Sequence, residues 1–263
     1  MKTDSDILNL STLRDMGLYV HIPFCKQKCM YCDFPAYQNL QDYYETYVYA
    51  LVQEIDLWVS EHPESTSKAI DTIYFGGGTP TELSIQHLQM ILDKIKNTFT
   101  ITDDCHMTIE SNPGEANLHY LTKLVKFGFN RISFGVQTFD DKALTMLHRS
   151  HNGEQAKQAV YDAKEAGFTD INIDLIYGLP FQSVDSFMFT LKKVIELNPD
   201  RLSVFNYAHL PSRFAGQAKI KDWQLPKPET KLEILQKTIE TLGSAGYKFI
   251  GMDHFAKPDD ELA

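Results

Sequence analysis

Apolar positions along the chain change their spacing several times between residues 17 and 252. Short runs rich in β-branched and aromatic residues predict strands, and the longer segments between them, with apolar residues every three to four positions, predict helices. The predicted strands are 17–22, 70–75, 105–110, 131–136, 170–177 and 201–207, with a short one at 247–252. The predicted helices lie near 41–60, 84–98, 117–127, 140–148, 154–166, 184–197 and 228–245.

This alternation of strand and helix is typical of repeated βα units around a parallel sheet. Six units are too few to close an eight-stranded barrel, so we predict an α/β fold with a partial, open (β/α)6 TIM-like barrel. The predicted organisation is an N-terminal extension at 1–16, a core at 17–212 and a C-terminal extension at 213–263. The final "KPDDELA" offers a helix N-cap without room for the helix, which predicts a fragment with an incomplete C-terminal extension.

Composition narrows the class of protein. The 263 residues are 43% hydrophobic, enough for a substantial core. No apolar run approaches the 18 residues of an integral membrane segment, and the polar start lacks the features of a signal peptide, so we expect a soluble, cytoplasmic protein. A formal charge of −10 argues against partners such as nucleic acid or an anionic membrane surface.

Three of the four cysteines fall within eight residues, in "LYVHIPFCKQKCMYCDF". Thiolates at Cys25, Cys29 and Cys32, on a loop after a predicted strand, can reach three corners of a cubane iron–sulfur cluster, which leaves one iron open to an exogenous chelator. Other interpretations remain: a zinc site completed by His21, a C-x2-C redox pair, or buried thiols. Cys105 is expected to be a packing residue.

A second motif, "YFGGGTPTEL", follows the second predicted strand. Gly76, Gly77 and Gly78 lack side chains, so the backbone there can lie against a ligand. No G-K-[ST] follows, so this is not a nucleotide P-loop. A tight βα turn would need only one glycine, and three favour contact with a ligand.

Together these motifs resemble the radical S-adenosylmethionine (SAM) proteins of the oxygen-independent coproporphyrinogen III oxidase and HemW haem-chaperone group. The matching segments span nearly the whole chain: "YVHIPFC", "FGGGTPTEL", "IESNPGE", "GFNRISFGVQTF", "NIDLIYGLP", "ELNPDRLSVFNYAHLP" and "FIGMDHFAKPDDELA". The resemblance implies a 4Fe-4S cluster on the three cysteines, with the amino and carboxylate groups of SAM on the fourth iron.

Four polar residues are site candidates in their own right. Glu110 and Gln137 end predicted strands, Asp174 interrupts an apolar strand, and Arg149 could hold a carboxylate through two hydrogen bonds. Each also has a structural interpretation as a solvated, sheet-end, ion-paired or helix-end residue. The resemblance assigns Glu110 to SAM, and Arg149, Gln137 and Asp174 to a second SAM or substrate-side site. It also places Tyr19, Tyr31, Thr79 and Ala208 along the SAM pockets.

Different parts of the chain resemble two branches of this group that have different functions. Phe34 stands where the oxidase branch has a further cysteine, and "LHRSHNGEQAKQA" looks like HemW, whereas the chain from about residue 172 looks like the oxidase. The oxidase branch uses one electron to cleave SAM, and the resulting radical starts the decarboxylation of two propionates of coproporphyrinogen III to vinyl groups. HemW-type proteins instead bind haem and deliver it to acceptor proteins.

The oxidase interpretation is preferred, with an unidentified electron donor and one or two SAM molecules. Its anionic substrate would need local cations, for which Arg213, Lys219 and Lys221 are candidates beside Arg149.

Overall fold

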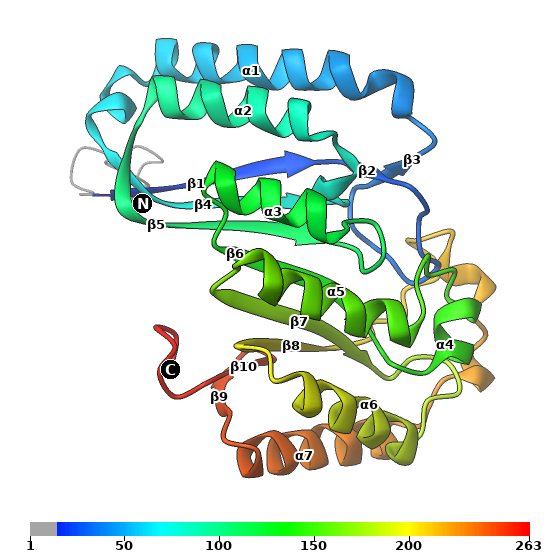
Figure 1. Cartoon of the computed structure of the whole chain (residues 1–263). Coiled ribbons are helices and arrows are strands. Elements are labelled where there is room, and N and C mark those ends of the chain that lie inside the picture. Colours follow the sequence, from blue (N-terminus) through cyan, green and yellow to red (C-terminus); the bar gives the residue numbers. More distant parts are fainter. Residues whose placement is uncertain (1–14) are drawn as a thin grey trace, which may run out of the picture.

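The computed structural model describes residues 15–263 (Figure 1). The predicted extension at 1–16 lies almost entirely outside these residues, as does the polar start that argued against a signal peptide. Within the described range no helix combines the length and the apolarity needed to cross a bilayer.

Six parallel strands form the body of one sheet, in the order β1-β4-β5-β6-β7-β8. They are β1 (Asp15–Ile22), β4 (Ala69–Gly77), β5 (Thr100–Ser111), β6 (Arg131–Gln137), β7 (Asp170–Tyr177) and β8 (Arg201–Asn206). In the described part of the chain β1 pairs only with β4, so the sheet is open. The predicted open (β/α)6 architecture is therefore confirmed.

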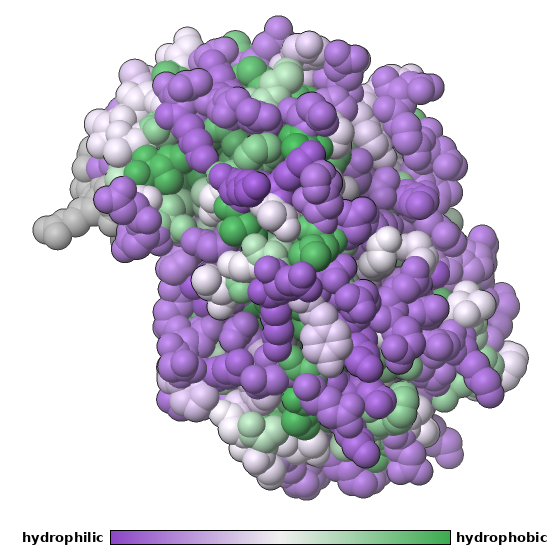
Figure 2. All heavy atoms as spheres, in the orientation of Figure 1, coloured by the Kyte–Doolittle hydropathy of each residue, from purple (hydrophilic) through white to green (hydrophobic). Residues whose placement is uncertain are grey.

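Helices cover the outer side of this curved sheet (Figure 1). They are α1 (Tyr44–Glu61), α2 (Ile85–Thr98), α3 (Leu118–Phe127), α4 (Asp141–Met146), α5 (Gly153–Ala166), α6 (Val184–Leu197) and α7 (Pro228–Ser244). Capping residues mark where these helices begin and end. In α5, Asn152 and Gln155 form a capping box at the start, and Gly167 ends the helix with φ 103°. Figure 2 shows that the face of the molecule seen in Figure 1 is mostly hydrophilic, with apolar residues exposed among the polar ones.

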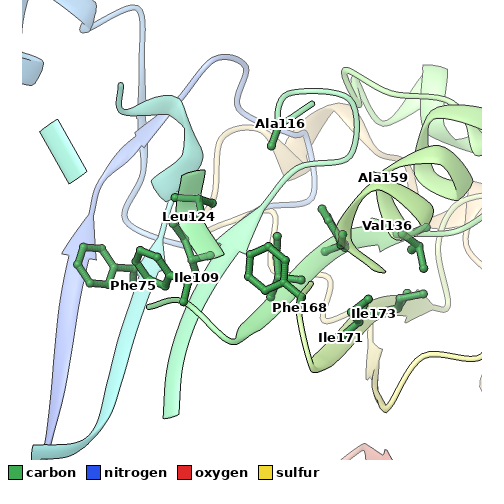
Figure 3. Close-up of a cluster of buried hydrophobic side chains, with 14 of the residues drawn as sticks. Phe75, Ile109, Ala116, Leu124, Val136, Ala159, Phe168, Ile171 and Ile173 are labelled. Carbon is green, nitrogen blue, oxygen red and sulfur yellow. The ribbon is translucent and has the colours of Figure 1, made fainter. Parts of the chain in front are cut away.

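The hydrophobic core lies between the strands and the helices. Alternate strand residues such as Phe75, Ile109 and Ile173 point toward the helices and pack against side chains such as Leu124 and Ala159 (Figure 3). The other residues of the same strands face the interior of the barrel and are largely polar. The two-residue period of a strand thus separates a dry core from a polar lumen.

The structure differs from the sequence prediction in three places. Strand β5 begins at Thr100 rather than near 105, because the polar residues after Ile101 form a bulge: Ile70 pairs with Ile101, but Thr72 pairs with His106. Two short strands, β2 (Phe24–Cys25) and β3 (Tyr37–Gln38), pair across the cysteine segment and were not predicted.

The third difference is a hairpin at the end of the chain. The single strand predicted at 247–252 is β9 (Lys248–Gly251), and it turns through Met252 and Asp253, both with positive φ, into the unpredicted strand β10 (His254–Ala256). Strand β10 pairs antiparallel with β8, so these residues continue the main sheet. The boundary between 212 and 213 stays a prediction. The terminal "KPDDELA" forms turns.

Candidate functional site

A cavity of about 710 Å³ occupies the lumen of the barrel. It runs from the cysteine segment, at the carboxyl ends of the strands, to the strand beginnings at the opposite end. Twelve of the fourteen residues predicted for the site line it: Cys25, Cys29, Cys32, Tyr31, Gly77, Gly78, Thr79, Glu110, Gln137, Arg149, Asp174 and Ala208. The other two, Gly76 and Tyr19, do not line it but neighbour Tyr74, which does: a Cβ added at Gly76 would come 2.7 Å from the Tyr74 ring, and the rings of Tyr19 and Tyr74 stack with centroids 5.9 Å apart.

The cysteine segment is held in shape by Lys28. Its ammonium group donates to the carbonyls of Phe34, at 3.1 Å, and Ala36, at 3.0 Å, and its backbone N–H donates to Oε1 of Gln38 at 2.9 Å. These bonds close the loop between β2 and β3. The three thiols therefore sit on an ordered loop whose backbone is fixed independently of any ligand.

The thiols are partly buried and face one cavity. Burial raises the pKa of Cys25 to about 11, against a hydrogen bond from Thr79 that lowers it, and burial also raises the pKa of Cys32. Such thiols are protonated at neutral pH, so binding a metal centre through them must release protons.

The spacing of the thiols bears on the kind of metal centre. Among the described residues, no three His, Cys, Asp or Glu side chains converge closely enough to hold a single metal ion. His21, the fourth ligand of the zinc interpretation, instead shares a 3.0 Å hydrogen bond with the Tyr19 hydroxyl through Nδ1. Three thiols on one loop that face one cavity are a donor set that a cubane cluster can take, with its fourth iron left for another ligand.

The three glycines at the carboxyl end of β4, Gly76 to Gly78, each have an internal packing reason. Gly77 has φ 117°, which favours glycine, and a Cβ on Gly78 would come within 2.4 Å of the Phe24 carbonyl. A Cβ on Gly76 would meet the ring of Tyr74 at 2.7 Å. The motif therefore brings the turn against β2 as well as presenting bare backbone to the cavity.

Glu110 is fixed from two sides. The Tyr74 hydroxyl donates to its Oε1 at 2.7 Å, and the N–H of Gly77 donates to its Oε2 at 3.1 Å. Burial raises the pKa of Glu110, whereas both hydrogen bonds lower it. The carboxyl group thus joins the glycine turn to β5 while one edge lines the cavity.

Arg149 links the cysteine segment to the strand ends. Its Nη1 donates to the Cys29 sulfur at 3.3 Å, and its Nη2 donates to Oδ1 of Asn112 at 2.7 Å and to the Gly135 carbonyl. Arg149 therefore connects the cysteine segment to the residue that follows β5 and to strand β6.

Gln137 shows two signs of a prepared binding position. Its φ is 68°, a left-handed conformation that strains a non-glycine residue, and its Oε1 is buried without a hydrogen-bond partner among the described residues. The buried Nε of Arg149 also lacks one in that part of the chain. Because buried polar atoms are normally paired, these two fit contacts with a polar ligand.

Asp174 lies deeper in the lumen. Ser133 donates to its Oδ2 at 3.0 Å, and Nδ2 of Asn172 donates to its Oδ1 at 2.7 Å. Burial raises the pKa of Asp174, opposed mainly by the hydrogen bond from Ser133. The carboxyl group does not interrupt an apolar surface, because it belongs to the polar face of β7.

Two lumen cations were missed. Arg131 and Arg201 begin β6 and β8 and line the far end of the cavity, whereas Arg213, Lys219 and Lys221 do not line it. Arg131 Nη1 lies 2.7 Å from Glu261 Oε1, and Arg201 Nε lies 2.6 Å from Asp260 Oδ2. The alternation of polar and apolar residues in "RISF" and "RLSV" is the signal that would have placed both arginines in the lumen.

The comparison with protein families decides the class. A model of the Radical SAM superfamily matches residues 19–194, which hold the cysteine segment, the glycine turn and five of the six parallel strands. The chain belongs to the radical SAM superfamily. Members of this superfamily use a 4Fe-4S cluster and SAM, and the donor set described above fits both.

Two curated radical SAM relatives carry the same name. Oxygen-independent coproporphyrinogen III oxidase from Escherichia coli (strain K12) is 47% identical over 251 residues, which cover 95% of this chain and 54% of that protein. The protein of that name from Helicobacter pylori (strain J99) is 40% identical over 256 residues, covering 97% of this chain and 56% of that protein. The chain spans about half the length of the curated relatives it matches.

Solved structures agree with this family. Coproporphyrinogen III oxidase (HemN) from Escherichia coli, described as a radical SAM enzyme, superposes with a TM-score of 0.90 at 47% identity, covering 95% of this chain and 57% of that one. SuiB from Streptococcus suis, solved with SAM, gives 0.56 at 16% identity over 88% of this chain and 45% of that one, which shows the shared fold alone.

Proposed function

We propose that this radical SAM chain takes part in the oxidative decarboxylation of coproporphyrinogen III in haem biosynthesis. The observation that carries the proposal is the agreement in both sequence and structure with oxygen-independent coproporphyrinogen III oxidase, at 47% identity and a TM-score of 0.90. SuiB, at 16% identity, shares only the fold with this chain. The chain is therefore much more similar to the coproporphyrinogen III oxidase than to SuiB.

Within this proposal Cys25, Cys29 and Cys32 hold the cluster. When bound, the cluster and SAM supply the one-electron cleavage and the hydrogen-abstracting radical of this superfamily. Thr79 donates a hydrogen bond to the sulfur of Cys25 and Arg149 donates one to the sulfur of Cys29, and these bonds orient the two thiols.

Polar atoms farther into the lumen would orient one or two SAM molecules. Glu110 presents a fixed carboxyl edge for an ammonium or hydroxyl group, and the unpartnered Oε1 of Gln137 accepts one further donor. Asp174 offers a second carboxyl group below them, and the bare backbone of Gly77 admits a ligand closely.

Haem binding in the manner of HemW is the second candidate, and one residue favours it. Phe34 replaces the further cysteine of the oxidase pattern, and its side chain is 58% exposed beside the cysteine segment. Delivery of haem to an acceptor protein would follow from that function. The electron donor is unidentified under either proposal, and both place the protein in the cytoplasm.

The deciding experiment is anaerobic. The cluster is reconstituted, dithionite, SAM and coproporphyrinogen III are added, and 5′-deoxyadenosine and the decarboxylated tetrapyrrole are quantified. Cys29→Ala should lose bound iron and both products, whereas Cys105→Ala, a matched change of the buried cysteine outside the motif, should keep them.

The two candidate functions give different patterns. Both products from the wild-type chain support the oxidase. SAM cleavage with unchanged tetrapyrrole, together with stoichiometric haem binding, supports the chaperone and rejects the oxidase. Phe34→Cys sharpens the choice, because it should raise tetrapyrrole turnover if the missing cysteine limits the oxidase.

A further inference from the structure

Two carboxyl groups meet behind the cysteine segment. Glu82 ends the 3-10 helix Pro80–Glu82, which follows the glycine turn, and Glu115 lies in the loop between β5 and α3. Their side chains are in hydrogen-bond contact, and the Tyr44 hydroxyl donates to Oε2 of Glu82 at 3.4 Å. Neither carboxyl group contacts a thiol directly or belongs to the residues predicted for the site.

The contacts of Glu115 favour a proton between the two groups. Its Oε1 accepts from Ser150 at 3.2 Å and from Asn112 at 3.4 Å, but its Oε2 is buried and has no donor among the described residues. Two ionised carboxylates in contact repel each other, whereas a proton on one of them provides the missing donor. Burial, and then the charge of Glu82, raise the pKa of Glu115 to about 7.

A short chain of polar contacts joins this pair to two thiols. Nδ2 of Asn112 donates to Oγ1 of Thr79 at 3.1 Å, and Thr79 donates to the Cys25 sulfur at 3.7 Å. On its other side Asn112 accepts from Arg149, which donates to the Cys29 sulfur. Asn112 is thus the common neighbour of the carboxyl pair and of both routes to the cysteine site.

The other ionisable groups facing the pair do not titrate near neutrality. Burial raises the pKa of Tyr44, on α1, and of Cys25, to about 12 and about 11, and it also raises that of Tyr120 on α3. Burial lowers the pKa of Arg149, but the net shift is upward, so its guanidinium stays charged throughout this range. A proton exchanged here between pH 6 and pH 8 therefore belongs to the carboxyl pair.

We propose that Glu82 and Glu115 share one proton, which is held more tightly when negative charge is added at the cysteine site. Reduction of a cluster bound there is then accompanied by proton uptake. An external one-electron reductant supplies the electron to the cluster, and the solvent supplies the proton to the pair, whose charge changes from −2 to −1. This inference rests on the cluster-binding part of the proposed function, but not on the identity of the substrate.

The sign of the effect follows from this coupling. Added negative charge stabilises the protonated pair, so the pair has a higher pKa beside the reduced cluster than beside the oxidised one. Between those two values the reduction potential must fall as pH rises. The limiting slope is about 59 mV per pH unit, the one-electron equivalent of a tenfold change.

The first test uses the metal-free chain. Infrared difference spectra between wild type and Glu115→Gln should contain a protonated-carboxyl band at pH 6 that is lost by pH 8, and Glu82→Gln should alter the same band. Glu154→Gln, which changes an exposed glutamate on α5, should leave it in place. A wild-type spectrum without any band sensitive to Glu115→Gln overturns the shared proton.

The second test measures the potential of the reconstituted cluster by EPR-monitored titration at several pH values. The wild type and Glu154→Gln should show a potential that falls with pH, and Glu115→Gln should show a flatter dependence. A bound cluster with a pH-independent potential in the wild type overturns the coupling and leaves the proposed function intact.

If no cluster forms, the proposed function fails, and the coupling is measured without metal. Alkylation of the thiols with iodoacetate adds negative charge, whereas iodoacetamide adds none. The infrared midpoint of the pair should lie at higher pH after iodoacetate, and equal midpoints overturn the inference.

Discussion

The two ends of the barrel lumen are built from the same strands but satisfy their polar groups differently. At the strand beginnings Arg131 and Arg201 contact Asp170, Asp260 and Glu261 in a closed set of ion pairs. At the carboxyl ends, buried polar atoms without hydrogen-bond partners remain among the described residues: Glu115 Oε2, Gln137 Oε1 and Arg149 Nε.

Because of this difference, one end of the cavity mainly stabilises the fold, and the other end is available to bind a ligand. Ion pairs completed within the chain stabilise the fold and leave nothing for a ligand to add. Unpartnered atoms and a left-handed Gln137 destabilise the free protein, and a bound polar ligand would supply partners for Gln137 Oε1 and Arg149 Nε. In barrels of this kind the carboxyl ends of the strands carry the chemistry, and the present site follows that rule.

The largest effect on stability is expected at the strand beginnings. Arg201→Ala leaves Asp260, whose side chain is only 6% exposed, without its cation, and should lower the free energy of unfolding by about 3 kcal/mol. Denaturant titration measures the loss. Lys193→Ala, at an exposed i,i+3 pair on α6, is the matched control and should change it by less than about 0.5 kcal/mol.

Iron content after reconstitution then tests the separation of the two ends. Folded Arg201→Ala should bind as much iron as the wild type. Loss of iron together with stability would show that the two ends are not independent.

A smaller effect is expected on the pH dependence of stability, which should differ between the two ends of the lumen. Hydrogen bonding to Arg131 lowers the pKa of Glu261 to about 2 from 4.5, so its contribution to stability is present above pH 4.5 and lost as pH falls toward 2. Burial raises the pKa of Glu115 to about 7, so its ionisation reduces stability as pH rises from 4.5 through 7.

The two glutamine variants should therefore diverge. Glu115→Gln should be more stable than the wild type at pH 8 by about 1 kcal/mol, and similar to it at pH 5. Glu261→Gln should be less stable at pH 7 by under about 1 kcal/mol, because the carboxylate is partly solvated, and should lose less stability on acidification. Unfolding curves at pH 3, 5 and 8 measure both, and parallel profiles would contradict the assignment.

The smallest expected change is at the end of β6. Gln137→Gly removes the strain of φ 68° and should raise the free energy of unfolding by about 0.5 kcal/mol, after allowing for the greater freedom of glycine in the unfolded chain. The same variant loses a polar contact and should weaken SAM binding about tenfold, measured by calorimetry on the reconstituted protein. A variant that is less stable and binds SAM normally would assign Gln137 a structural role.

Much of the architecture was predictable from the sequence, because the two-residue and 3.6-residue periods are strong between residues 17 and 210. The strand positions, the cysteine segment and most cavity-lining candidates followed from local patterns. The early start of β5 was missed because exposed Asp103 and Asp104 form a bulge, and β10 was missed because Met252 is a weak signal for positive φ.

The partners of the site residues could not be predicted in the same way. The contact between Glu82 and Glu115, and the reach of Asn112 toward Thr79 and Arg149, depend on register between elements far apart in the sequence. Local patterns place a side chain on a face, but three-dimensional packing decides which group it meets. The same limit explains why exposed lysines were proposed as cations when Arg131 and Arg201 line the lumen.

The ion pairs at the strand beginnings also constrain the order of folding. Arg131 and Glu261 are 130 residues apart, and Arg201 and Asp260 are 59 apart. Contacts of such long sequence separation form late, because the loop between the partners must be closed first. During synthesis on a ribosome, Arg131 and Arg201 therefore face an unfinished lumen without these partners until residues 260 and 261 emerge.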